Sequence, residues 1–96
     1  MTYRLEFLPS AQKEWRKLGA TVQKQFKRKL VERLENPRVA ASKLVGAQDR
    51  YKIKLRTSGF RLVYSVREDV LVVTVLAVGK RDKSSVYRKA EGRSEP

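Results

Sequence analysis

The chain has 96 residues, 41% of them hydrophobic, which suits one compact domain (residues 1–96) with one core and excludes a disordered chain. It contains neither cysteine nor histidine, so disulfides, thiolate chemistry and a histidine base are excluded, and its ten scattered acidic residues give no reason to expect a metal or another cofactor. The formal net charge of +13 exceeds what solubility requires and indicates a polyanionic partner, such as nucleic acid or an acidic protein.

The cellular location that we expect for the chain follows from sequence features that it lacks. No stretch approaches the roughly 18 to 20 apolar residues of a membrane helix. The N-terminus, MTYRLEFLPS, carries an acid and no small-residue cleavage pattern, so we expect no signal peptide. The absence of cysteine fits a reducing cytoplasm, and the absence of a strongly hydrophobic amphipathic helix argues against a membrane partner.

The start of the chain predicts a strand and a helix. Residues 2–8 alternate weakly between apolar and polar side chains, as a strand does. Pro9 and Ser10 then begin a helix, with Ser10 as its N-cap, and Gly19 ends it. Trp15 falls on the apolar face of this helix and is expected in the core.

A second helix follows at once and completes a helical hairpin. Thr21 is its predicted N-cap, and Asn36 with Pro37 stops it. Apolar side chains at four-residue steps form one stripe that includes Phe26, which we expect in the core. The opposite face is cationic. Three of its side chains, interpreted as solvated surface, are Lys24, Lys27 and Arg28.

Three strands follow a connector at residues 37–49. They are expected at about residues 50–56, 60–67 and 70–78, separated by short turns with Ser-Gly and Glu-Asp pairs. The last strand is apolar on both faces and should therefore be central in the sheet. The order β-α-α-β-β-β indicates an α+β domain, in which the helical hairpin packs on one face of a mainly antiparallel sheet and the other face stays partly open.

The register of the hairpin at residues 51–64 follows from parity. Facing residues on paired strands share a face of the sheet, so Ile53 is expected opposite Leu62. The same register places Lys54 opposite Arg61 on the outer face. Like charges in facing positions cost stability, and a locally unfavourable choice inside a consistent pattern indicates a functional surface.

The outer face of this hairpin is a candidate phosphate site. Residues 50–67 hold six cations and no acid, whereas an ordinary solvated face mixes both signs. RNA can be cut there without metal or histidine, because its own 2′-hydroxyl can attack the adjacent phosphate. Arginine matches phosphate oxygens, and crowded cations favour a neutral lysine that accepts a proton. The cations that share this face are Lys52, Lys54, Arg56 and Arg61.

The C-terminal segment adds cations and an aromatic ring. Lys80 and Arg81 lie where the chain leaves the last strand, and Tyr87 follows. An aromatic ring among cations suits stacking of a base beside neutralised phosphates, but the same ring could instead pack the tail onto the sheet. Apolar residues within 86–90 have the spacing of one helical turn, and the polar tail 89–96 is expected to fray.

Five ordered motifs carry a resemblance to a known family: EWRKLG at 14–19, KLVG at 43–46, YKIKLR at 51–56, GFRLVY at 59–64 and VGKRDKSSVY at 78–87. Together they resemble the RelE toxins of bacterial type II toxin–antitoxin systems. The resemblance implies a microbial ribonuclease-like α+β fold and metal-independent cleavage of mRNA in the ribosomal A site, which leaves a 2′,3′-cyclic phosphate. Members of the family often continue in an apolar C-terminal helix, whereas this chain has the polar segment RKAEGRSEP, so the docking of such a helix stays open.

The resemblance also implies roles for individual residues. Lys52 and Lys54 match lysines that contact phosphate, and either could take the 2′ proton. Arg61 matches an arginine that supports the developing phosphate charge, and Arg81 one near the leaving group. Tyr87 matches a tyrosine that stacks on the mRNA base and aids the chemistry. Which group is the general base stays open. The residues expected to bind RNA are Lys24, Lys27 and Arg28 on the second helix, together with Arg56 and Lys80.

The resemblance implies several partners. They are a cognate RelB-like antitoxin that is partly acidic and carries an amphipathic helix, the ribosome with its rRNA and A-site mRNA, and operator DNA reached only through the toxin–antitoxin complex. Two alternatives stay open. One is a ParE-like inhibitor of DNA gyrase with the same fold, and the other is a non-catalytic nucleic-acid-binding module.

Overall fold

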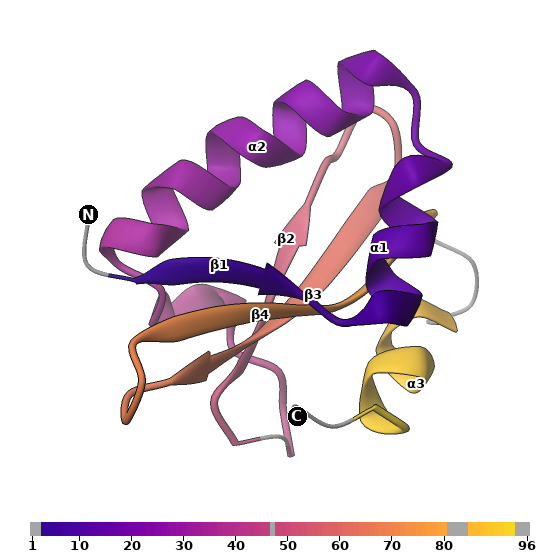
Figure 1. Ribbon diagram of the computed structural model, residues 1–96. Coiled ribbons are helices and arrows are strands. Elements are labelled where there is room, and N and C mark those ends of the chain that lie inside the picture. The colour runs from indigo at the N-terminus through magenta and orange to yellow at the C-terminus, as the bar shows by residue number, and fades with distance from the viewer. Residues whose placement is uncertain (1–2, 47, 81–84, 94–96) are drawn as a thin grey trace.

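The fold is α+β, as the sequence predicts, and the computed structural model describes residues 3–46, 48–80 and 85–93. Its elements run in the expected order, with one more helix at the end (Figure 1). They are β1 (Arg4–Phe7), α1 (Pro9–Arg16), α2 (Ala20–Glu35), a short 3₁₀ helix (Ala40–Ser42), β2 (Arg50–Lys54), β3 (Phe60–Arg67), β4 (Val72–Lys80) and α3 (Ser85–Glu91).

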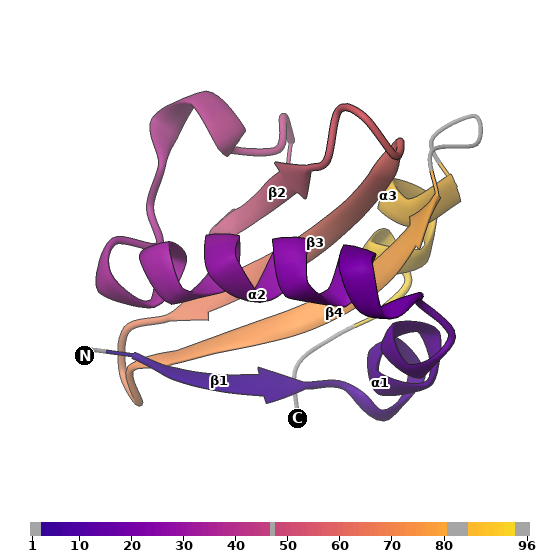
Figure 2. The same cartoon turned by 90° about the horizontal axis from the view of Figure 1, so that it is seen from above.

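The four strands form one sheet in the order β1-β4-β3-β2 (Figure 2). The strand β3 is antiparallel to both of its neighbours, β2 and β4, whereas β1 runs parallel to β4. The strand β4 is flanked on both sides and is buried from Val72 to Val78. This confirms the prediction, made from its apolar side chains on both faces, that the last strand is central.

Helices cover both faces of the sheet (Figure 1). The long helix α2 crosses one face, and α1 packs on β4 and β1. Phe26 of α2 is fully buried, as expected, but Trp15 of α1 is only half-buried, and its ring packs edge-on against Phe7. Val31, which belongs to the predicted apolar stripe of α2, remains 57% exposed.

The predicted register of the β2–β3 hairpin is correct. Ile53 lies opposite Leu62, and Lys54 lies opposite Arg61. Both apolar residues are buried on the α2 side of the sheet. A slip of one residue would move them to the other face, so their burial fixes the register. The turn lies between Lys54 and Phe60, as this register requires. Gly59 in the turn has a φ of 77°, a conformation that glycine adopts without steric cost.

The two predicted helix caps are wrong. The N-cap of α1 is Leu8 rather than Ser10, and the N-cap of α2 is Gly19 rather than Thr21. Proline suits the first helical position, because its fixed φ fits the helix and its missing N–H would have no partner there. Pro9 therefore begins α1 before Ser10 can cap it.

The sequence left open whether a C-terminal helix docks, and the structure shows that one does. The helix α3 packs on β4 and β3, on the face opposite α2. Val86 and Ala90, one turn apart, are only 2% and 1% exposed. This sheet face is therefore less open than predicted, and Val63, which lies opposite Lys52, is buried there.

Candidate functional site

Three of the predicted site residues meet on the sheet face that carries α3. The phenol oxygen of Tyr87 accepts a hydrogen bond of 2.8 Å from Nη1 of Arg61. The guanidinium carbon of Arg61 lies 5.7 Å from the centre of the Tyr87 ring, and Nζ of Lys52 lies 6.0 Å from it. All three side chains are half-buried, so the ring and both cations keep part of their surface in solvent.

The backbone explains this grouping. Pairing of β2 with β3 brings Lys52 and Lys54 to the same face as Arg61, because side chains alternate along a strand. Facing like charges at Lys54 and Arg61 are unfavourable, and an anion between them would relieve that repulsion. The helix α3 then carries Tyr87 over the two strands. The arrangement can hold a phosphate and an adjacent base at one place.

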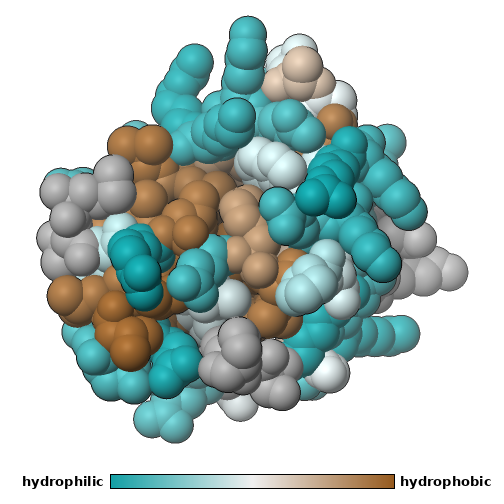
Figure 3. Space-filling view, viewed as in Figure 1, coloured by the Kyte–Doolittle hydropathy of each residue, from teal (hydrophilic) through white to brown (hydrophobic). Residues whose placement is uncertain are grey.

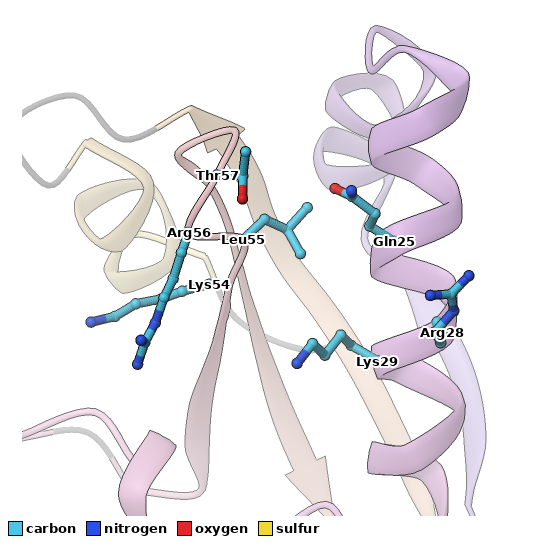
Figure 4. Close-up of a pocket in the computed structure, with 7 residues that line it drawn as sticks. All are labelled: Gln25, Arg28, Lys29, Lys54, Leu55, Arg56 and Thr57. Carbon is cyan, nitrogen blue, oxygen red and sulfur yellow. The ribbon is translucent and has the colours of Figure 1, made fainter.

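The cationic face continues to the end of the hairpin. A hollow of about 370 Å³ is lined by Lys54, Leu55, Arg56, Gly59 and Arg61. Figure 4 shows Leu55 pointing toward α2 and Lys54 pointing the opposite way. Lys54 and Arg56 are exposed. The structure thus brings Arg56, predicted as an RNA contact, beside the predicted catalytic residues.

A second hollow lies between α2 and the hairpin (Figure 4). Its volume is about 340 Å³. The residues that line it are Gln25, Arg28, Lys29, Lys54, Leu55, Arg56 and Thr57. Arg28 was predicted as an RNA contact, whereas Lys29 was not chosen from the sequence, although it belongs to the same cationic helix face. The two hollows share Lys54 and Arg56, so the cationic surface is continuous from the sheet to α2.

The remaining predicted RNA contacts lie elsewhere or outside the described residues. Lys80 is exposed at the end of β4, opposite Phe60. Lys24 is exposed on α2, and Lys27 borders a different, apolar hollow between α2 and β1, where Figure 3 shows apolar side chains gathered. Arg81, predicted to lie near the leaving group, is outside the described residues.

Sequence reasoning missed the residues that hold α3. Glu14 of α1 accepts two hydrogen bonds from Arg93, at 3.0 and 3.1 Å, and one of 3.0 Å from the Val78 amide. Arg50, at the start of β2, donates to the carbonyl oxygens of Ala90 and Arg93 at 2.7 and 2.9 Å. The partners in the Glu14–Arg93 pair are 79 residues apart, so no local pattern reveals them.

The ionisation of Glu14 is coupled to these contacts. Burial raises the pKa of its carboxyl. Hydrogen bonds from Arg93 and the Val78 amide, together with the charges of Arg93 and Lys89, lower it by more. The net result is a pKa below the ordinary value, so Glu14 is held as a carboxylate.

Within residues 3–46, 48–80 and 85–93, there is no group of three or more acidic, histidine or cysteine side chains placed to hold a metal ion. In the same part of the chain no helix has both the length and the apolar character needed to span a membrane.

Comparison with known proteins shows close relatives. Residues 5–84 match the model of a family described as the ParE toxin of the type II toxin–antitoxin system, parDE. The chain is 58% identical over 93 residues to the mRNA interferase toxin RelE of Escherichia coli K12, which covers 97% of this chain and 98% of that protein. It is 50% identical over 93 residues, with the same coverage, to a RelE-like toxin protein of Escherichia coli.

Solved structures agree in fold. A mutant of the E. coli toxin RelE in the free state superposes with a TM-score of 0.90 at 57% identity, covering 97% of this chain and 98% of that one. The toxin in the intact E. coli RelBE toxin–antitoxin complex superposes with a TM-score of 0.82 at 58% identity, covering 84% and 99%. The resemblance inferred from the motifs is therefore confirmed, and this chain belongs to the RelE/ParE family, the toxins of type II toxin–antitoxin systems.

Proposed function

We propose that this toxin is an endoribonuclease that cuts mRNA in the A site of the ribosome without a metal ion. The observation that carries the proposal is the grouping of Lys52, Arg61 and Tyr87 on one sheet face, with the Tyr87 hydroxyl hydrogen-bonded to Arg61. Identity of 58% over nearly the whole chain to a protein named an mRNA interferase supports the same activity.

The proposed reaction uses a nucleophile that RNA itself supplies. The 2′-oxygen forms a bond to the neighbouring phosphorus while the bond from phosphorus to the 5′-oxygen breaks. A base on the protein takes the 2′ proton, and an acid gives a proton to the departing 5′-oxygen. The products are a 2′,3′-cyclic phosphate on the upstream fragment and a free 5′-hydroxyl on the downstream fragment.

The side chains divide these tasks. The guanidinium of Arg61 neutralises the charge that develops on the phosphate, because its planar fork matches two phosphate oxygens. Lys52 and Lys54 hold the same phosphate, and either is a candidate for the base. Tyr87 stacks on a base of the mRNA and takes part in proton transfer, and Arg81 assists the leaving group.

The ribosome supplies what this small site lacks. Acid–base groups contribute rate factors of about 10² to 10⁴, whereas correct alignment of the reacting atoms is worth several powers of ten more. A free RNA chain rarely places its 2′-oxygen in line with the bond that breaks. An mRNA held in the A site is already ordered, so we expect cutting on the ribosome and little cutting of naked RNA.

The same proposal names the other partners. A RelB-like antitoxin inhibits the toxin, as suggested by relatives that were solved as toxin–antitoxin complexes. The pair represses its own operon, with the toxin reaching operator DNA only through the complex. We place the toxin in the cytoplasm, where its ribosomal substrate lies.

The test is to map mRNA 3′ ends on ribosomes stalled with an empty A site, with and without the protein. Naked RNA and a reaction in EDTA run in parallel, so that a contaminating metal nuclease is recognised. We expect a discrete cut in the A-site codon that is unaffected by EDTA and absent from naked RNA. Absence of a cut, with the folded protein bound to ribosomes, would reject the proposal.

A single substitution tests the assignment of the site. Arg81→Ala should keep ribosome binding and lose cutting, because the departing 5′-oxygen loses its cationic neighbour. Binding is measured by co-sedimentation with ribosomes, and cutting by the same 3′-end mapping. Cutting by Arg81→Ala at the parent rate would contradict the role given to this residue.

A second candidate function rests on the family model, whose description names ParE toxins. ParE-like relatives that inhibit DNA gyrase generally lack this set of lysines, arginines and terminal tyrosine, so we rank gyrase inhibition second. If ribosomes are not cut, a supercoiling assay with DNA gyrase decides between that activity and a module that only binds nucleic acid.

A further inference from the structure

The helix that carries Tyr87 has little apolar contact to hold it. It is seven residues long, and isolated helices shorter than about 12 residues are marginal in water. Val86 and Ala90 are its fully buried side chains within the described residues, and Ala90 contributes only a methyl group, while Tyr87 packs on the core and stays partly exposed. Apolar burial alone is therefore a weak anchor for α3, and its polar contacts must supply much of the rest.

The first polar anchor is built where the sheet leaves backbone groups unpaired. The ladder between β1 and β4 ends at Val75, so the following residues of β4 have no strand beside them on that edge. Leu76 belongs to this stretch, and the register shift between β3 and β4 leaves it without a partner residue on β3 as well. The Val78 amide donates to Glu14, and the Leu76 carbonyl accepts 2.7 Å from Arg93.

Glu14 and Arg93 thus replace a strand at this edge and join α3 to it. Arg93 makes a two-pronged contact with the Glu14 carboxylate while its Nη1 also reaches Leu76. The two side chains are only 18% and 21% exposed, which strengthens the pair relative to one in open solvent. Lys89 of α3 adds a further charge, with Nζ 3.3 Å from the same carboxylate.

The second polar anchor acts on the C-terminal end of α3. Both Nη atoms of Arg50 donate to carbonyl oxygens there, those of Ala90 and Arg93. The last carbonyls of a helix lack partners within the helix and carry partial negative charge, so a guanidinium is well placed at this end. Arg50 lies at the start of β2, the same strand that carries Lys52.

We propose that Glu14, Arg50 and Arg93 are positioning residues that hold α3 on the sheet and thereby keep Tyr87 over Lys52 and Arg61. Tyr87 precedes Arg93 by six residues, roughly 9 Å along a helix at 1.5 Å per residue. The clamp is therefore at one end of α3 and the tyrosine at the other. The catalytic part of this inference rests on the proposed function, whereas the anchoring of α3 does not depend on RNA.

The first experiment measures anchoring in the free toxin, without RNA or ribosomes. Amide hydrogen exchange is followed by NMR in the parent, in Arg93→Ala and in Arg88→Ala. Arg88 is an exposed cation on the same helix and serves as the matched control. We expect Arg93→Ala to raise exchange rates in α3 by about tenfold or more while β3 and β4 keep the parent rates, and Arg88→Ala to change neither.

The second experiment measures cutting on stalled ribosomes under single-turnover conditions. We expect Arg93→Ala to lower the maximal rate by about ten- to a hundredfold, the scale of effect of misplacing a catalytic group, without changing the half-saturating ribosome concentration. Arg93→Lys should recover part of the rate, because it keeps the charge. In a Tyr87→Ala background Arg93→Ala should cost nothing further, because the tyrosine it positions is gone.

The outcomes separate this inference from the proposed function. Unchanged exchange in α3, or an equal loss of rate from Arg93→Ala with and without Tyr87, would overturn the positioning role. A general loss of protection in β3 and β4 would make Arg93 a residue of global stability and would also overturn it. If the parent toxin cuts nothing, the proposed function fails, and hydrogen exchange still decides whether the clamp holds α3.

Discussion

Tyr87 lies beside two cations, and its phenol oxygen accepts a hydrogen bond from Arg61. A hydroxyl in this position has its lone pair directed at the guanidinium and its proton free for another acceptor. Part of the ring stays in solvent, so a nucleotide base can stack on it. The same residue can therefore bind RNA through its ring and act on a proton through its oxygen.

Two substitutions separate these uses of Tyr87. Tyr87→Phe keeps the ring and should lower the single-turnover cutting rate by about ten- to a hundredfold, with ribosome affinity unchanged, because only the hydroxyl is lost. Tyr87→Ala should lower the rate further, since stacking on a base is worth about 1–3 kcal/mol. Rates are measured on stalled ribosomes. Parent-level cutting by Tyr87→Phe would show that the hydroxyl takes no part in the reaction.

Tyr64 shows a tyrosine with a structural role in the same sheet. Its side chain is fully buried, its hydroxyl donates to the Pro37 carbonyl at 2.7 Å, and Arg33 donates to it at 2.8 Å. It ties the connector after α2 to the sheet. The sequence analysis gave a site role to Tyr87 and none to Tyr64, whose hydrogen bonds join residues that are 27 and 31 positions apart in the chain.

Tyr64→Phe should reduce the free energy of unfolding by about 1–3 kcal/mol, because it leaves the Pro37 carbonyl and Arg33 without their shared partner. Tyr3→Phe is the matched control. The Tyr3 hydroxyl donates to Glu68, whose side chain is 54% exposed and can bind water instead, so the loss should be smaller. Urea denaturation measures both, and an equal loss would contradict this distinction between buried and exposed acceptors.

The elements differ in how well the sequence predicts them. The β2–β3 hairpin was predicted to the residue, because one of its faces is buried and a slip of one position would expose Ile53 and Leu62. The central place of β4 followed from its two apolar faces in the same way. The site residues on β2 and β3 were therefore correctly assigned to one face before the structure was known.

The docking of the last helix could not be predicted from the sequence, for a physical reason. Periodicity detects apolar stripes, and α3 has only two buried apolar side chains. What anchors it is a set of ionic and hydrogen-bonded contacts with α1, β2 and β4, whose partners are far apart in the sequence. Such contacts leave no local pattern, so the polar sequence of the tail does not decide whether it docks.

The clamp of α3 should make stability depend on acid pH. Glu14 has a lowered pKa in the folded protein, whereas unfolding restores the ordinary value of 4.5. The stabilisation is therefore complete above that value and is lost as the pH falls through the lower pKa of the folded state. Glu14→Gln should be less stable than the parent near neutral pH, and the difference should shrink as the pH falls below 4.5.

Urea denaturation of both proteins across this range provides the measurement. The parent keeps a second acid-sensitive group, because hydrogen bonds from Arg38 and Tyr3 also lower the pKa of Glu68. Glu14→Gln should thus flatten the acid limb of the stability curve without abolishing it. A difference between the two proteins that is constant with pH would show that ionisation of Glu14 does not stabilise the fold.

At the scale of the whole molecule, the positive charge divides into two groups. Some cations are tied into the fold, including Arg33, Arg38, Arg50 and Arg93. Others line the continuous surface that runs from the sheet face to α2. The net charge of +13 indicated a polyanionic partner but could not separate these groups, because both contribute equally to a count.

The continuous surface predicts a specific salt dependence of ribosome binding. Each phosphate contact releases counterions, which adds about 0.7 to 0.9 to the slope of log affinity against log salt. Replacing Arg28 and Lys29 together by Ala should weaken binding and reduce that slope by about one to two. The cutting rate of the bound toxin should stay at the parent value, since neither residue belongs to the group of Lys52, Arg61 and Tyr87.

The matched control removes two cations from another surface. Lys13 and Arg16 are exposed on α1, away from the hollow between α2 and the hairpin. Replacing both by Ala lowers the net charge by the same amount, so a general charge effect would change the two double variants equally. A larger loss of slope from Arg28 and Lys29 would locate the phosphates in that hollow, and equal losses would mean that α2 only contributes to the overall field of the toxin.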